Sequence, residues 1–272
     1  MMFERGNGYR PDLKDPRRMN EKLAWRKLYQ RIPFAPAISD KLAVREYVSQ
    51  RAGPQYLRDL IAVYEDANAI DFDKLPNAFV AKANHASGFN VFVPDKASAD
   101  LEAIRRKLHR FLMTRDYGKY KNEWWYSRIQ PRIIIEPLLT DREWSPPVDY
   151  ELYTFDGVVK VIALTFDRFG TIRKSHYTPD WQFMDLTALP TGPETPRPKH
   201  LDEIIEVAQA LGRGIDYARM DLLCPNDERV IFGEVTLAPR AGWARFSMPE
   251  TDLHLGSLWT RRPALDIGWG AD

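Results

Sequence analysis

The stretch "YELYTFDGVVKVIALTF", residues 150–166, places the narrowest limit on what this chain can fold into. It contains two runs rich in β-branched and aromatic residues, and Asp156-Gly157 between them suits the positive φ angles of a two-residue turn. Each run has the length of a strand and is far too short to span a membrane. The sequence therefore predicts an antiparallel hairpin at the centre of its second half.

A second hairpin is predicted further along, with strands over 217–224 and 229–236 around "PNDE". Asp221 and Glu234 interrupt these otherwise apolar strands, and pairing would bring them close together. Two buried carboxylates repel each other unless a cation lies between them, and oxygen ligands beside substrate phosphates suit Mg²⁺. The alternative is that both lie on a solvated face, paired with Arg219 or Arg229.

Helical spacing of apolar residues predicts helices near 20–32, 39–53, 98–114 and 201–214. From residue 132 onward, most of the sequence has patterns typical of β-strands. We therefore expect an α+β protein with a helical N-terminal region over 1–75, a small α+β module over 76–131 and a larger antiparallel sheet module over 132–272.

The charge balance excludes some classes of function. The 272 residues include 39 Lys and Arg against 38 Asp and Glu, a net charge of +1, so nothing indicates a nucleic-acid partner. The single cysteine, Cys224, cannot form an internal disulfide and fits a reducing compartment. No apolar segment follows the first ten residues, so we expect a cytoplasmic protein without a secretory signal.

Lys82 is an unusual residue for its place, because it lies inside the apolar run "FVAKA". A small polar loop follows it, with donors and residues that accept tight turns. Strand, lysine, loop and strand over 79–93 suggest a flap that folds over phosphates. There is no GxxxxGK[ST] motif, and a lysine at a strand edge that extends into solvent is the simpler alternative.

Glu136 follows three isoleucines and precedes Pro137, which cannot donate a hydrogen bond to a neighbouring strand. A strand that leaves its sheet there would expose main-chain groups and one carboxylate beside an apolar slot, which suits adenine and ribose. The alternative is an edge strand with an exposed glutamate. Lys41, directly after Asp40 at a predicted helix start, is unremarkable by itself.

In this order the motifs resemble the ATP-grasp superfamily. More narrowly, "GYRPDLKDPRRMNEKLAWRKLYQR", "DKLAVREYV", "FVAKANHASGFN", "PRIIIEPLL" and "FGEVTLAPRAG" resemble its TupA-like branch, named for teichuronopeptide biosynthesis. The resemblance implies an ATP-grasp fold, in which two α+β subdomains enclose ATP, with a short helical N-terminal region. It also implies ATP and Mg²⁺ as cofactors.

The resemblance further implies a role for each matching position. The residues implied to bind nucleotide are Lys41 and Lys82 for the phosphates, His85, Ser87 and Gly88 in the closing loop, and Glu136 and Leu138 for ribose and adenine. Those implied to bind magnesium are Asp221, Glu234 and Thr236. Those implied near the transferred phosphoryl group or the acceptor are Arg219, Arg168, Arg173 and His176.

Two positions depart from the family pattern. Thr236 stands where ATP-grasp enzymes commonly have Asn, and a hydroxyl coordinates a second metal ion less readily. Glu151 stands in "DYEL" where the branch often has a lysine, which exchanges a positive charge for a negative one.

The resemblance implies an ATP-dependent carboxylate–amine ligase that works through an acyl-phosphate. It would join an amino acid or another amine to a small carboxylate, with a sugar-linked substrate as one form of this, in cell-surface polysaccharide or related biosynthesis. A glycosyltransferase is the first alternative, because "DFD" at 71–73 matches the DxD pattern that binds nucleotide sugars. A phosphotransferase on the same fold and a non-catalytic ATP-binding protein are the others.

Overall fold

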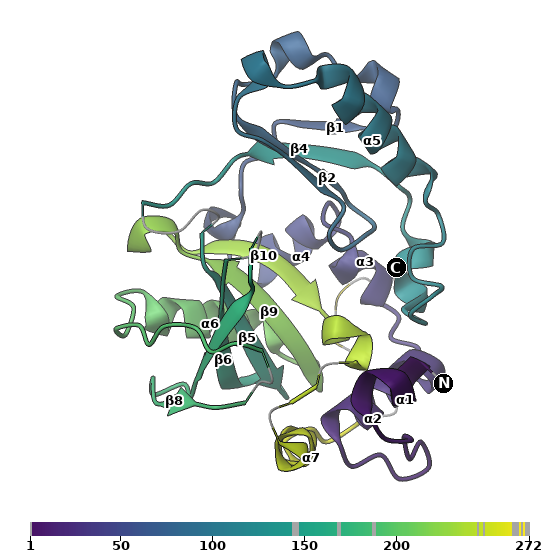
Figure 1. Ribbon diagram of the computed structural model, residues 1–272, viewed down its shortest axis with the longest axis vertical. Coiled ribbons are helices and arrows are strands. Elements are labelled where there is room, and N and C mark those ends of the chain that lie inside the picture. The colour runs from purple at the N-terminus through teal and green to yellow at the C-terminus, as the bar shows by residue number, and fades with distance from the viewer. Residues whose placement is uncertain are drawn as a thin grey trace.

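The structure is a computed structural model that describes residues 2–142, 147–167, 170–186, 189–243, 245–246, 248–262, 267 and 269. Two antiparallel sheets with helices packed around them make it an α+β protein, as expected (Figure 1). Among the described residues, no helix is long and apolar enough to cross a membrane. Seven short 3-10 helices complete the described elements: Pro54–Tyr56, Ala67–Ala69, Phe72–Lys74, Lys96–Ser98, Trp124–Arg128, Pro225–Asp227 and Pro239–Gly242.

The small sheet has the strand order β1-β4-β2-β3, and its strands are β1 (Ala62–Tyr64), β2 (Phe79–Ala83), β3 (Asn90–Val93) and β4 (Ile133–Pro137). Alternation along β2 turns Phe79, Ala81 and Ala83 into one core, whereas Lys82 faces the other way. Helix α5 (Leu101–Met113) packs on β2. Because β1 and β4 both belong to this sheet, it takes strands from outside the expected 76–131 module.

The large sheet has the order β10-β9-β5-β6-β7-β8, with strands β5 (Asp149–Phe155), β6 (Val158–Phe166), β7 (Arg173–Tyr177), β8 (Phe183–Met184), β9 (Tyr217–Leu223) and β10 (Ile231–Thr236). Both predicted hairpins are confirmed, since β5 pairs with β6 and β9 with β10. Asp156 and Gly157 have φ of 50° and 76°, as the predicted turn requires. Helix α6 (Leu201–Gly212) covers the opposite face from the site described below.

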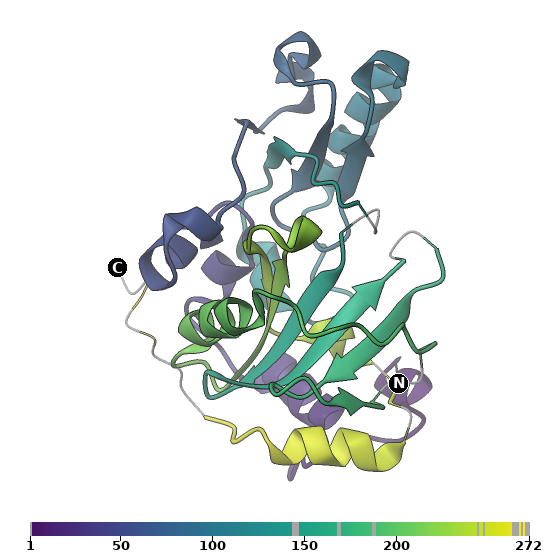
Figure 2. The ribbon, with the colours of Figure 1, turned by 90° about the vertical axis from the view of Figure 1, so that its left-hand side faces the viewer.

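The N-terminal helices are α1 (Met2–Asn7), α2 (Met19–Tyr29), α3 (Ala35–Ser39) and α4 (Val44–Arg51), and α2 packs against α7 (Pro249–Ser257) (Figures 1 and 2). Their buried side chains, such as Leu23, Ile38 and Tyr47, lie in the same core as the large sheet. Arg26 of α2 is fully buried, donates to the carbonyl oxygens of Tyr217 and Leu237, and forms an ion pair with Asp216. The N-terminal helices are therefore part of the large-sheet unit.

The small sheet is connected to the rest of the molecule on two sides. On one side the chain enters through residues 57–61 and leaves after β4. On the other side, the segment between α5 and β4 runs back toward the N-terminal helices, where the 3-10 helix Trp124–Arg128 packs against α3 (Figure 1). Trp125 of that helix is buried in the core of the large sheet. This segment, residues 114–132, braces the two sheets against each other.

Candidate functional site

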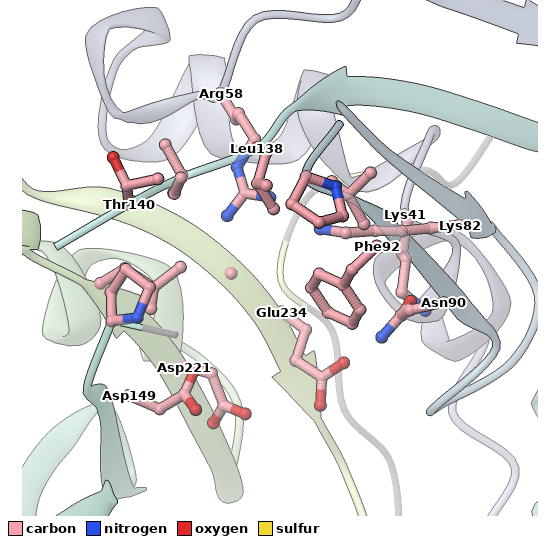
Figure 3. A pocket seen from close by; sticks show the side chains of 16 residues that line it. Lys41, Arg58, Lys82, Asn90, Phe92, Leu138, Thr140, Asp149, Asp221 and Glu234 are labelled. Atoms are coloured by element: carbon pink, nitrogen blue, oxygen red, sulfur yellow. The ribbon is translucent and has the colours of Figure 1, made fainter. Parts of the chain in front are cut away.

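A cavity of about 270 Å³ lies between the two sheets. Its cationic side chains are those of Lys41, Arg58 and Lys82, and its acidic side chains are those of Asp149, Asp221 and Glu234. Figure 3 shows the cations on the side of the small sheet and the carboxylates of Asp149 and Asp221 across the gap. The apolar lining is supplied by Val80, Phe92, Pro94, Leu138, Leu139, Pro147 and Leu223. The cavity thus combines an apolar part with two walls of opposite charge.

Lys82 projects into this cavity from β2, where its strand partners are Asn90 and Ile134. Its Nζ donates to Oε2 of Glu136 at 2.7 Å, and 17% of its side chain is exposed. Burial lowers the pKa of Lys82 to about 8, with a further contribution from Arg58, while Glu136 opposes the shift. Lys82 is therefore a mostly buried lysine whose ammonium group faces the cavity, which explains a charged residue inside an apolar strand.

Lys41 reaches the same wall from the turn between α3 and α4. Its backbone N–H donates to the carbonyl of Asn84 at 3.1 Å and its Nζ to that of Ala86 at 2.5 Å, so it is fixed to the loop after β2. Asp40 caps the turn by accepting from the backbone N–H of Leu42 at 2.8 Å. Burial lowers the pKa of Lys41, and Glu234 across the cavity opposes this.

Glu136 lies behind the cationic wall. Its Oε2 accepts from Lys82 and also from Nη1 of Arg58 at 3.0 Å. Burial would raise the pKa of this carboxyl, but the two cations outweigh burial and lower it. The structure therefore places Glu136 as the anchor of two cations, while Leu138, expected beside adenine, lines the cavity directly.

Two of the three carboxylates of the acidic wall come from the β9–β10 hairpin, where Asp221 and Glu234 are direct partners. A bulge between Phe232 and Glu234 shifts the register by one residue, which brings Glu234 opposite Asp221. Gly233 permits it: a Cβ there would lie 2.8 Å from the carbonyl oxygen of Asp221. The glycine in "FGEV" is thus a requirement for two neighbouring carboxylates.

Arg219 holds this pair in place. Its Nε and Nη2 donate to the two carboxylate oxygens of Asp221 at 2.7 and 2.6 Å, and Nη2 lies 3.6 Å from Oε1 of Glu234. Thr236 donates its hydroxyl to that Glu234 oxygen at 3.0 Å. Burial raises the pKa of Asp221, Arg219 opposes this, and the nearby carboxylates of Glu234 and Glu151 add to it.

The donor set fits magnesium. Mg²⁺ is usually bound by one or two carboxylates and completes its shell with water and substrate phosphates. Asp221 and Glu234 supply two carboxylates on one wall, and a cation between them would offset their repulsion, which adds to burial in raising the pKa of Asp221. No cluster of three or more His, Cys, Asp and Glu suited to a metal occurs among the described residues.

Glu151 joins the acidic wall to a further cation that the sequence did not indicate. Its Oε2 accepts from Nζ of Lys174 at 2.5 Å and lies 3.4 Å from Nη1 of Arg219, and its Oε1 accepts from Thr165. Burial would raise the pKa of Glu151, but Arg219 and Lys174 lower it. The family pattern led us to expect a lysine at position 151. In this chain Glu151 stands there, and Lys174 beside it supplies a positive charge at that place.

Strand alternation separates Arg173 from His176, two of the residues predicted near the transferred group. Arg173 lies on the α6 side of β7, where it forms an ion pair with Asp167 at 2.6 Å, away from the cavity. His176 lies on the same face as Lys174, buried, and burial lowers its pKa to about 4, so it is neutral at neutral pH. Arg168 lies outside the described residues.

The loop residues predicted to close on the nucleotide do not line the cavity. A ring nitrogen of His85, Nε2, lies 2.9 Å from the carbonyl oxygen of Thr114, so the ring points toward the end of α5. The carbonyl of Ser87 accepts from the hydroxyl of Tyr117 at 3.0 Å, and Gly88 has φ of 78°. The loop is anchored on its small-sheet side.

Arg58, Asn90 and Phe92 line the cavity and were missed from the sequence. Asn90 and Phe92 could have been found, because they are two residues apart on the strand that pairs with β2 and so share the face of Lys82. Nothing local marks Arg58, which reaches the cavity only through the packing of the N-terminal region.

With Lys82 at the phosphates of ATP, as the family resemblance implies, we expect nucleotide affinity to depend on pH. Its pKa of about 8 in the unliganded protein means that the ammonium group loses its proton above that pH, and a neutral amine cannot pair with phosphate. Affinity for ATP should therefore fall as pH rises, by up to about tenfold per unit above 8. Calorimetry from pH 6.5 to 9.5 measures this, and in Lys82→Arg, which stays protonated, the decline should vanish.

A sequence model of the family described as TupA-like ATPgrasp matches residues 21–260. No curated protein matches the chain.

Among solved structures, the chain is similar to D-alanine–D-alanine ligase from Bacillus anthracis, with 16% identity, a TM-score of 0.43 and coverage of 74% of this chain and 57% of that one. It is also similar to a RimK domain ATP-grasp protein from Sphaerobacter thermophilus DSM 20745, with 12% identity, a TM-score of 0.45 and coverage of 83% and 67%. For the ADP complex of purK, N5-carboxyaminoimidazole ribonucleotide synthetase, these values are 9%, 0.49, 80% and 50%. The chain thus spans half to two thirds of the length of these proteins.

Proposed function

Because this chain belongs to the TupA-like ATP-grasp family, we propose that it is an ATP-dependent carboxylate–amine ligase that works through an acyl-phosphate. The proposal places magnesium and the phosphates of ATP in the cavity between the sheets. Lys41 and Lys82 bind the phosphates, and Asp221 and Glu234, supported by Thr236, bind the metal ion. The adenine occupies the apolar part of the cavity beside Leu138.

One observation carries the proposal: the two walls of a single cavity have opposite charge. Phosphates alone would be repelled by Asp149, Asp221 and Glu234, and a metal ion alone would be repelled by the cations. A magnesium–nucleotide complex satisfies both walls, because its phosphates face the cations and its metal ion faces the carboxylates.

The chemistry would need no nucleophilic side chain. A carboxylate oxygen of the first substrate attacks the γ-phosphorus and ADP leaves. The amine then attacks the acyl carbon, loses a proton and displaces phosphate. Magnesium, when bound, neutralises charge that develops on the phosphoryl oxygens. Arg219 and Lys174 both contact Glu151, next to the two carboxylates proposed to bind magnesium. From there they would neutralise the negative charge of the acyl-phosphate.

The substrate class is proposed from the family's name alone. A branch named for teichuronopeptide biosynthesis suggests that the carboxylate or the amine is linked to a sugar destined for the cell surface. The single cysteine, which fits a reducing compartment, favours a reaction in the cytoplasm. A phosphotransferase of the same fold would differ in its product, since it would release ADP and a stable phosphorylated compound without an amine.

The glycosyltransferase alternative lacks support from the site. Asp71 caps the 3-10 helix Phe72–Lys74 by accepting from the backbone N–H of Asp73 at 3.2 Å, and it pairs with Lys74 at 3.1 Å. Both aspartates lie outside the cavity lining. They have the contacts of an ordinary capped turn.

Calorimetry with ATP, ADP and UDP-sugars, each with and without Mg²⁺, tests the proposal. We expect wild-type protein to bind ATP and ADP only weakly without magnesium, and Asp221→Asn to abolish the magnesium dependence. The double variant Asp71→Asn/Asp73→Asn should bind ATP as wild type does. Binding of UDP-sugar alone, lost in the double variant, would overturn the ATP proposal in favour of a glycosyltransferase.

A further inference from the structure

Arg58 is a cation of the cavity wall that comes from the N-terminal region. It lies between the 3-10 helix Pro54–Tyr56 and β1, and other arginines hold its backbone in place. Nη1 of Arg45 donates to the carbonyl of Arg58 at 2.9 Å, and Nη2 of Arg229, in the β9–β10 turn, donates to that of Leu57 at 3.0 Å. The backbone at Arg58 is therefore held by side chains from α4 and from the β9–β10 turn.

The side chain of Arg58 is only partly satisfied by the protein. Its Nη1 donates to Glu136, but its Nε is buried and has no hydrogen-bond acceptor among the described residues. The side chain is 11% exposed, and in Figure 3 its guanidinium group lies in the cavity lining next to Leu138. Oδ1 of Asn90, on the same wall, also lacks a partner among the described residues. Buried polar atoms without partners are rare in folded proteins, so a polar ligand is expected here.

Charge leads to the same conclusion. Lys41, Lys82 and Arg58 line one wall, and among the described residues only Glu136 supplies a carboxylate hydrogen-bonded to them. Asp149 and Glu234, from the opposite side of the cavity, attract Arg58 and Lys41 electrostatically, so an anion with a bound cation fits between the walls better than an anion alone. The mutual repulsion is visible in Lys82, whose pKa is lowered by burial and then by Arg58 and Lys41. The wall therefore has a surplus of positive charge that calls for an anion.

We propose that Arg58 binds a phosphate group of the nucleotide, as a third cation beside Lys41 and Lys82; this rests on the proposed ATP site. A guanidinium group suits the task because its planar fork of five donors can keep its bond to Glu136 and still donate to a phosphate oxygen. Lysine has no such fork. The anion-binding wall thus extends from the small sheet into the N-terminal region.

The test compares Arg58→Met and Arg58→Lys with wild type, using calorimetry with Mg·ATP and Mg·ADP and competition with adenosine. One charge-assisted hydrogen bond corresponds to about a 10- to 100-fold change in affinity. We expect Arg58→Met to weaken ATP and ADP binding by that factor and Arg58→Lys to lose less. Adenosine, which has no phosphate, should bind all three proteins equally.

Arg132→Met is the matched control, because Arg132 forms an exposed ion pair with Glu65 outside the cavity. It should bind all ligands as wild type does. Equal affinity of Arg58→Met and wild type for ATP would overturn the role of Arg58 and leave the ATP site standing. The role of Arg58 would also be overturned if Arg58→Met weakened the binding of adenosine as much as that of ATP, because equal losses indicate a distorted cavity. Failure of the wild type to bind any nucleotide would instead overturn the proposed function.

Discussion

Replacement of Lys82 by methionine should lower kcat/KM for ATP by about 10²- to 10³-fold, the effect of removing one preorganised donor from a site that excludes water. Methionine keeps most of the volume and packing of the lysine stem but removes the ammonium group that faces the cavity. Glu136 retains Arg58 as a partner, so the anchor is not left unpaired.

The fold should tolerate this change. Because burial lowers the pKa of Lys82 to about 8, below its ordinary value of 10.5, the charged form is disfavoured by folding. Lysine therefore contributes less stability below pH 8 than above pH 10.5, and its removal at pH 7 should leave the melting temperature equal or higher. Lys74→Met, at an 82% exposed side chain, is the control and should match wild type in both assays. Full activity of Lys82→Met would exclude a phosphate role for this lysine.

The largest effect on stability is expected for Arg26→Met, which should cost about 3–5 kcal/mol because it leaves the Asp216 carboxylate buried without its cation. Arg26 and Asp216 are fully buried, and Arg26 also fills two carbonyl acceptors and lies over the ring of Trp259. Urea unfolding monitored by tryptophan fluorescence measures the change in free energy of unfolding.

Two controls sharpen this experiment. Arg17→Met removes an exposed pair with Asp15, and we expect a change below about 1 kcal/mol. Adding Asp216→Asn to Arg26→Met removes the unpaired charge, so the double variant should recover part of the loss. If Arg26→Met alone costs no more than Arg17→Met, the buried pair does not hold the N-terminal helices to β9 and β10.

Local patterns were sufficient to predict the two hairpins and the two neighbouring carboxylates on the second hairpin. The Asp156-Gly157 turn, the strand assignment of Lys82 and the pairing of Asp221 with Glu234 all depend on short stretches whose period is readable. The α+β class and the family were confirmed as well. Arg173 was named from the family resemblance; "DRFGTIRKSH" alternates poorly, so the sequence did not show that Lys174, and not Arg173, lies on the face of Glu151.

Long-range packing could not be predicted. The helices before residue 52 share the core of a sheet that begins at residue 149, and no pattern within either segment reports this. The same applies to Arg58, whose place depends on Arg45 and on the distant turn that contains Arg229. The sequence indicated that Glu136 is a functional position, but not that it binds two cations, because one of them, Arg58, is 78 residues away in the chain.

The brace formed by residues 114–132 bears on the thermodynamics of ligand binding. With Trp125 in the core of the large sheet and β4 in the small one, the two walls of the cavity are held apart at a separation that the fold itself sets. A ligand that enters such a preorganised site loses less of its binding free energy to the ordering of the protein than one that must draw two loose domains together. Affinity in this protein should then depend mainly on how well the charges of the two walls match those of the ligand.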